Sequence, residues 1–166
     1  MISRIHLAVA LTFCALGLAP GMAHVMELPI KLAYSPARYA DVTSTLYGWF
    51  GVVGGALQVT AALVVAALAY RLRRSSVAPM AIASTAALWV SLALWGALVA
   101  PVNAAWAEVS PADTGFAAAY AALRDRWEYG HVAAFIAWLT GWFGLVAIVT
   151  RLAAGEGHRN VATGGG

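Results

Sequence analysis

Apolar residues fill four long stretches of this chain, and short polar segments separate them. Each stretch reaches the roughly 17 to 25 residues that a helix needs to cross about 30 Å of hydrocarbon. A backbone donor or acceptor cannot stay unpaired in lipid, so each crossing segment must be helical. The pattern therefore predicts an all-α bundle of four transmembrane helices. We place these helices at about 5–27, 46–70, 77–102 and 111–153.

The polar segments carry the signals that set the helix ends. Pro29 disfavours helical backbone at the residue before it, so the first helix should end just past Glu27. The last helix should begin at Ser110 and Pro111, because a capping serine followed by proline is a typical helix start.

The chain is predicted to form one domain. The turn at 71–76 is tight, which makes the second and third helices antiparallel neighbours. The transmembrane domain covers 1–154, and the polar, glycine-rich segment 155–166 is expected to be a flexible tail.

Composition agrees with a membrane protein. Hydrophobic residues make up 62% of the chain and charged residues 10%, and the mean hydropathy is +0.77. A soluble domain carries about 25% charged residues, so an ordinary soluble protein is excluded. The net charge of +3 reflects basic residues near the helix ends. We expect membrane lipids as partners and no nucleic acid.

Lys and Arg are distributed unevenly between the two sides of the predicted bundle. One side holds six basic residues and one acid, and the other holds four basic residues and six acids. The basic residues of the first side are Arg4, Arg71, Arg73, Arg74, Arg151 and Arg159. By the positive-inside rule this side is cytoplasmic and holds both termini. The two longer loops then face outward.

The first apolar stretch also fits a second interpretation. Arg4, the apolar run 7–19 and the small residues Gly21 and Ala23 resemble the three regions of a secretory signal peptide. Cleavage after Ala23 would make His24 the N-terminus, and a terminal amine beside an imidazole binds copper well. We favour an uncleaved helix, and the other three helices keep their orientation in either case.

Two mirror-image motifs lie at the outer ends of the first and last helices. They are His24-Val25-Met26-Glu27 and Glu128-Tyr129-Gly130-His131. Residues three apart share a helix face, so each motif presents one imidazole beside one carboxylate. Ionisable groups at membrane depth are costly and tend to be functional. We therefore expect the two pairs to face each other and form one site.

Three kinds of chemistry fit these four residues. As metal ligands, His24, Glu27, Glu128 and His131 suit iron, zinc, manganese or copper, and they resemble the Glu-x-x-His pairs of di-iron bundles. A haem held by His24 and His131 is the main cofactor alternative. Without a metal, His131 would act as a base with Glu27 or Glu128 as its catalytic partner. Asn103, Tyr34 and Tyr47 are expected to line the pocket and contact a cofactor or substrate.

The two carboxylates also have a simpler interpretation. Glu27 lies four residues before Lys31, and Arg124 lies four before Glu128, so each carboxylate could form a surface ion pair. The four motif residues would then be a polar clasp between the first and last helices.

Three longer segments of the sequence include the two motifs or lie beyond them. The segments are 23–29, 101–103 together with Trp106, and above all 123–131, which reads Leu-Arg-Asp-Arg-Trp-Glu-Tyr-Gly-His. On these segments the chain resembles an uncharacterised family of small four-helix bacterial inner-membrane proteins. The resemblance covers most of the chain, from the first helix to the fourth. It implies the same fold and a multi-pass location in a bacterial inner membrane, and it implies no activity. In the orientation that the positive-inside rule gives, the site faces the periplasm or exterior.

The sequence as a whole favours a membrane protein with an outer-face His/Glu site that binds a metal or haem for redox chemistry on a small or lipophilic molecule. Two alternatives remain open. One is a metal-free acid/base enzyme acting on a lipid-like substrate. The other is a non-enzymatic accessory subunit of a larger membrane complex or a homo-oligomer, packed through small residues such as Gly51 and Gly55.

The charge asymmetry predicts where fused reporters will lie. A reporter joined after Gly166 should be cytoplasmic, and one inserted near Ser110 should be external, because basic residues cluster on the other side. Paired phosphatase and fluorescent-protein fusions measure both positions. An external C-terminus would contradict the four-helix topology, and the mass of the intact protein shows whether the chain starts at His24.

Overall fold

The computed structural model describes the backbone of residues 4–163 and the side chains of residues 4–154. Within these bounds the chain is helical apart from short turns and contains no strand. The all-α prediction is therefore confirmed. The elements in chain order are α1 (Arg4–Leu16), α2 (Leu18–Leu32), α3 (Pro36–Leu46), the π-helical η1 (Phe50–Gly54), α4 (Gly55–Leu72), α5 (Ala78–Leu94), the π-helical η2 (Trp95–Val99), α6 (Ala100–Ala107) and α7 (Phe116–Thr163).

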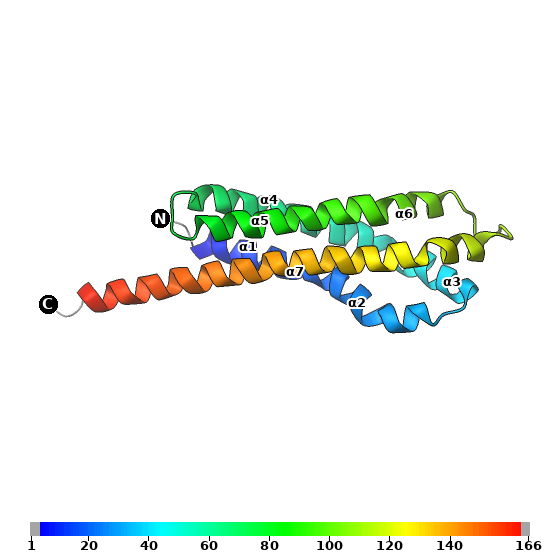
Figure 1. Cartoon of the computed structure of the whole chain (residues 1–166), viewed down its shortest axis with the longest axis horizontal. Coiled ribbons are helices and arrows are strands. Elements are labelled where there is room, and N and C mark those ends of the chain that lie inside the picture. Colours follow the sequence, from blue (N-terminus) through cyan, green and yellow to red (C-terminus); the bar gives the residue numbers. More distant parts are fainter. Residues whose placement is uncertain (1–3, 164–166) are drawn as a thin grey trace.

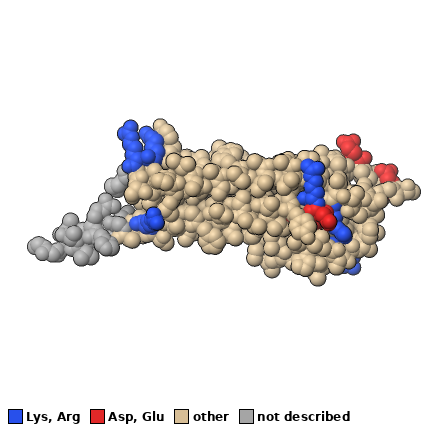
Figure 2. All heavy atoms as spheres, in the orientation of Figure 1, with Lys and Arg blue, Asp and Glu red and all other residues tan. Residues whose placement is uncertain are grey.

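Four helical segments are long and apolar enough to cross a membrane, namely Arg4–Leu32, Phe50–Leu72, Ala78–Ala107 and Phe116–Ala154. Figure 1 shows one elongated bundle in which α1 begins and α7 ends at the same end. On the face drawn in Figure 2, charged side chains gather toward the two ends and leave an uncharged band between them. This arrangement fits a multi-pass membrane protein, and the side of the membrane that each end faces stays a prediction. Following that prediction, we call the end at which α1 begins the inner end and the opposite end the outer end.

The last helix is longer than the sequence analysis expects. The predicted start at Ser110 and Pro111 is wrong, because Ser110 and Asp113 form a turn in which the Ser110 N–H donates to the Asp113 carboxylate. The helix begins at Phe116 and continues through most of the segment that we predict to be a flexible tail, as far as Thr163. The rest of that tail, 164–166, lies outside the described residues.

The first span is interrupted at Gly17, between α1 and α2. Pro20 has no N–H to give to the carbonyl of Leu16, and its ring crowds that carbonyl, so the helix breaks one turn before it. The break is closely packed, since a Cβ on Gly17 would lie 2.5 Å from the ring of Trp138. Gln58 of α4 donates to the Gly17 carbonyl at 3.0 Å.

The prediction that Pro29 ends the first helix near Glu27 is wrong. Helix α2 continues to Leu32 with Pro29 inside it. An internal proline removes one backbone hydrogen bond, and the additional turn gains a buried ion pair between Lys31 and Glu128 of α7. Tertiary contact thus overrides the local signal.

Helix α3 occupies a segment in which the sequence analysis expects only a loop. Ser35 caps it by accepting a hydrogen bond from the backbone N–H of Arg38, and Pro36 takes the first helical position. The helix packs along the outer part of α7 and buries Tyr39 completely. The connection between the first two spans is therefore an ordered part of the outer end.

The third span widens into η2 just before Pro101. Pro101 has no N–H for the carbonyl of Ala97, and Arg126 of α7 donates to that carbonyl at 3.0 Å. Gly130 lets α7 come close at this point, because a Cβ there would lie 2.9 Å from Val99. The proline break therefore joins η2 to α7 beside the second motif.

Close contacts between α5 and α7 hold the inner half of the bundle. A Cβ on Gly144 of α7 would lie 2.2 Å from the hydroxyl of Ser84, and one on Gly141 would lie 2.7 Å from Leu88. Trp138 is fully buried and donates from its indole N–H to the carbonyl of Cys14 at 2.9 Å. Small residues thus let these helices approach without intervening side chains.

The α5–α7 contact predicts a strong effect of one added methyl group. Gly144→Ala should destabilise the protein by about 1–3 kcal/mol, the usual cost of overpacking. Adding Ser84→Gly should restore most of this loss, because the serine hydroxyl is the nearest obstacle. Unfolding in detergent micelles measures both variants. Gly96→Ala is the control, since nothing lies within 4 Å of its Cβ position. Equal stability of Gly144→Ala and this control would show that the helices are not in such close contact.

Candidate functional site

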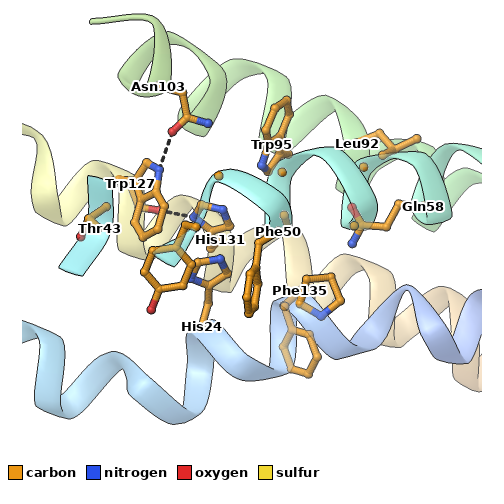
Figure 3. A pocket seen from close by; sticks show the side chains of 18 of the residues that line it. His24, Thr43, Phe50, Gln58, Leu92, Trp95, Asn103, Trp127, His131 and Phe135 are labelled. Atoms are coloured by element: carbon orange, nitrogen blue, oxygen red, sulfur yellow. Dashed lines mark hydrogen bonds between the residues drawn. The ribbon is translucent and has the colours of Figure 1, made fainter. Parts of the chain in front are cut away.

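The structure brings the two mirror-image motifs together near the outer end of the bundle. The rings of His24 and His131 are stacked, with centroids 3.9 Å apart and planes inclined by 29°. Helix α2 supplies His24 and Glu27, and α7 supplies Glu128 and His131. Figure 3 shows the two imidazoles side by side at the centre of a pocket.

Lys31 lies between the motifs. Its ammonium nitrogen Nζ is 2.9 Å from Oε2 of Glu128, 3.2 Å from Nδ1 of His24 and 3.7 Å from Oε2 of Glu27. The side chain of Lys31 is 3% exposed and that of Glu128 is 0% exposed. Buried charges require partners, so each of these two groups makes the burial of the other possible.

Two tyrosines complete the network around Lys31. Tyr39 of α3 donates its O–H to Oε1 of Glu128 at 3.0 Å, and Tyr47 donates its O–H to Oε2 of Glu27. Burial raises the pKa of both phenols above the ordinary 10.0, and the neighbouring carboxylate raises it further by a smaller amount. Both tyrosines therefore keep their protons at neutral pH and remain hydrogen-bond donors.

The hydrogen bonds assign opposite tautomers to the two imidazoles. Nδ1 of His131 lies 2.8 Å from the carbonyl oxygen of Trp127, which can only accept, so a neutral His131 carries its proton on Nδ1 and keeps a lone pair on Nε2. Nδ1 of His24 faces the Lys31 ammonium, which can only donate, so a neutral His24 carries its proton on Nε2. The pair therefore offers one acceptor and one donor.

A pocket of about 520 Å³ opens beside this pair, and both histidines line it. Its walls are mostly apolar and aromatic, and they come from α2, α3, η1, α4, α5, η2, α6 and α7. Figure 3 shows Trp127 beside the imidazoles and Phe50 and Phe135 on the deeper side. In the described part of the chain, nothing donates to or accepts from the Nε2 atom of either histidine. Both atoms are therefore available to a bound molecule.

The other predicted pocket residues fall in two places. Tyr47 and Asn103 line this pocket, and the side-chain oxygen of Asn103 accepts from the indole N–H of Trp127 at 2.7 Å. Tyr34 lies instead on a smaller pocket, of about 300 Å³, beside Glu27.

The four predicted metal ligands meet but do not form a metal site. Among the described residues, no three His, Cys, Asp or Glu side chains are arranged to hold a metal ion. A nitrogen lone pair lies in the plane of its ring, and the two nearly parallel rings direct no lone pairs to a point about 2 Å from both. Both carboxylates are bound to Lys31 and a tyrosine. The lysine ammonium takes the central position that a cation would need.

The same geometry does not fit a haem held between the two histidines. Axial ligation requires one imidazole on each face of the macrocycle, with both nitrogens directed at the iron. His24 and His131 contact each other face to face, which leaves no room for a macrocycle between them.

Three residues of the site could not be identified from the two motifs. The sequence predicts Lys31 only as a possible surface partner of Glu27, and it predicts no place in the site for Tyr39 or Trp127. In the structure Lys31 also lies over the rings of Tyr47 and Trp127, at 4.8 and 5.1 Å from their centroids. A lysine two residues after a proline, on a helix end bordering the membrane, is the one feature of the sequence that could have drawn attention to it.

Comparisons with models of protein families, with curated proteins and with solved structures found no match to this chain.

The buried pair predicts a large loss of stability when one partner is neutralised. Glu128→Gln should cost about 3–5 kcal/mol, because it leaves the Lys31 charge without its nearest partner. Lys31→Met in the same chain should recover part of that loss. Asp125→Asn is the matched control, since Asp125 is 76% exposed and 3.8 Å from Arg124, and such pairs contribute about 0–1 kcal/mol. The unfolding midpoint in micelles measures each variant, and a Glu128→Gln protein no weaker than the control would contradict the buried network.

Proposed function

We propose that the protein is a membrane-embedded enzyme that moves a proton to or from an uncharged, lipophilic molecule in the pocket, with His131 as the base. The observation that carries this proposal is the stacked imidazole pair on the pocket wall, in which one Nε2 atom has a lone pair and the other a proton. General acid/base catalysis requires at least a basic atom and a proton donor side by side, and the two Nε2 atoms supply them.

The two histidines have different roles in this proposal. The Trp127 carbonyl holds the ring of His131 in the tautomer that leaves Nε2 basic. The Lys31 ammonium holds the ring of His24 in the tautomer that makes Nε2 a donor. His24 also stacks on Tyr47, with centroids 4.9 Å apart, which fixes its orientation. No reorganisation of these rings is needed before a proton is transferred.

Glu27 and Glu128 are positioning residues in this account. Each is within 3.7 Å of Lys31, and each accepts a hydrogen bond from a tyrosine. They hold the lysine that orients His24, as carboxylates beyond the first contact often do for a histidine. In this role the two carboxylates bind neighbouring side chains, as they would in the polar clasp that the sequence allows.

The proton transfer has a simple form for a lipophilic ketone. His131 Nε2 takes a proton from the carbon next to the carbonyl, and the electrons of the C–H bond move into an enolate. The Nε2–H of His24 donates to the developing enolate oxygen, where negative charge gathers. Return of a proton from His131 restores the ketone. In deuterated water the Nε2–H of the imidazolium exchanges with the solvent before it returns, and the ketone then gains deuterium.

The environment of the pocket suits such a substrate. The lining is largely apolar, and the pocket lies within segments that can span a membrane. In the predicted orientation it faces the periplasmic or outer half of a bacterial inner membrane. Burial of the site from water strengthens each polar contact that the substrate makes.

Deuterium uptake into 2-undecanone tests this proposal. This ketone is uncharged and lipid-like, and mass spectrometry follows its exchange in D₂O with the protein in lipid nanodiscs. The wild type should accelerate exchange over empty nanodiscs, and His131→Gln should lower this acceleration by about 10²-fold, the usual contribution of a general base. His6→Gln is the control, because His6 lies far from the site beside the carbonyl of Val64.

The outcome also separates this function from its rival. If the protein is an accessory subunit, the ketone should exchange no faster than with empty nanodiscs. If His131 is catalytic, the exchange should be faster. Equal exchange by the wild type and His131→Gln would overturn the proposal.

A further inference from the structure

Aromatic residues line both ends of the pocket beside the histidines. At the outer end, Trp106 stacks on Tyr120 with centroids 4.3 Å apart and contacts Trp127 at 5.5 Å. At the inner end, Trp138 is fully buried and anchored to the Cys14 carbonyl. All four aromatic residues line the pocket. These rings narrow the pocket along the bundle axis, while the exposed Ser44 and Asn103 keep its outer end in contact with water.

The side of the pocket between these two ends is lined in part by glycines. Its lining includes Gly48, Gly51 and Gly55, and nothing lies within 4 Å of the Cβ position of any of them. These residues are three and four positions apart, so they share one helix face. Gly51 lies in η1, and its backbone is exposed within a segment that can span the membrane.

The two π-helical segments on this side are separated from each other. Within the described residues η1 packs on α2 and α4, whereas η2 packs on α5, α6 and α7, and the two do not pack closely together. Phe50 of η1 and Trp95 of η2 both line the pocket. In a bilayer the exposed Gly51 on this side would face the acyl chains.

Gln58 continues the glycine face into the pocket, one turn beyond Gly55. Its amide nitrogen donates to the Gly17 carbonyl at 3.0 Å, and its side-chain oxygen remains as an acceptor. Gly17 is seven residues before His24, which corresponds to about 10 Å along a helix. Figure 3 shows Gln58 on one side of the imidazole pair and Thr43 on the other. The pocket thus has a second polar point, deeper in the membrane than the histidines.

We infer that the ligand is an uncharged, lipophilic molecule that enters sideways from the bilayer, between η1 and η2, and that hydrogen-bonds to Gln58 as well as to the histidines. The inference rests on the proposed function for its chemical class and adds the route and the second anchor. Three observations carry it: the aromatic rings at both ends, the open glycine face, and His24, which lines the pocket and whose Nε2 has no partner in the described part of the chain. The absence of Lys, Arg, Asp and Glu from the pocket lining favours a neutral ligand.

Binding of a fluorescent probe tests this inference. The probe is 6-propionyl-2-dimethylaminonaphthalene, a neutral ketone whose fluorescence is excited by energy transfer from tryptophan, and the protein is the full chain in nanodiscs. Gly51→Phe and Gly55→Phe should each raise the dissociation constant at least about tenfold, because the new ring fills space that the ligand needs. Gln58→Leu should raise it about tenfold through the lost hydrogen bond.

Gly96→Phe is the matched control. Gly96 lies in η2, is exposed and has nothing within 4 Å of its Cβ position, but it does not line the pocket. This variant should bind the probe as the wild type does. Equal affinity of the two pocket variants and this control would overturn the inference, and so would the absence of saturable binding to the wild type.

The two assays separate this result from the proposed function, because one measures binding of the probe and the other measures proton transfer. Binding without deuterium exchange by the wild type would refute the proton transfer and leave the route intact. Exchange that persists in Gly51→Phe at the wild-type rate would refute the route and leave the chemistry intact.

Discussion

The ion pair between Lys31 and Glu128 is the contact on which the outer half of this protein depends. Two charges have been removed from water at the edge of a membrane, and an unpaired charge there would be very costly. Their attraction joins α2 to α7, and the hydrogen bond from Tyr39 adds α3 to the same point. The lysine then faces His24, so a structural contact also determines the chemistry of the imidazole.

The proline and glycine positions make this contact possible. Pro20 and Pro101 interrupt the first and third spans, and each break frees a carbonyl or widens a helix beside the pocket. Gly17 and Gly130 then let Trp138 and η2 come close to the neighbouring backbone. The result is a bundle that packs tightly in its inner half and encloses a pocket in its outer half.

Hydrophobic length and helical spacing were enough to predict much of this arrangement. Four apolar segments predict four spans, and the i, i+3 spacing of His24 with Glu27 and of Glu128 with His131 predicts which groups share a face. The position of Lys31 could not be predicted, because its main partner is 97 residues away and Pro29 indicated that the helix had already ended. The role of Tyr39 depends on α3, a helix that the polar composition of 36–46 did not reveal. Metal binding seemed attractive because two histidines and two carboxylates are common ligands, whereas the stacking of the rings is decided by packing alone.

The central claim is that the two stacked imidazoles are neutral and hold opposite tautomers. Nitrogen-15 NMR of histidine-labelled protein in nanodiscs measures this directly, because protonated and lone-pair ring nitrogens have well-separated chemical shifts. Variants lacking His24 or His131 in turn assign the signals among the four histidines of the chain. The account predicts a proton on Nδ1 and a lone pair on Nε2 for His131, and the reverse for His24. Identical tautomers, or two protonated nitrogens on either ring at neutral pH, would contradict it.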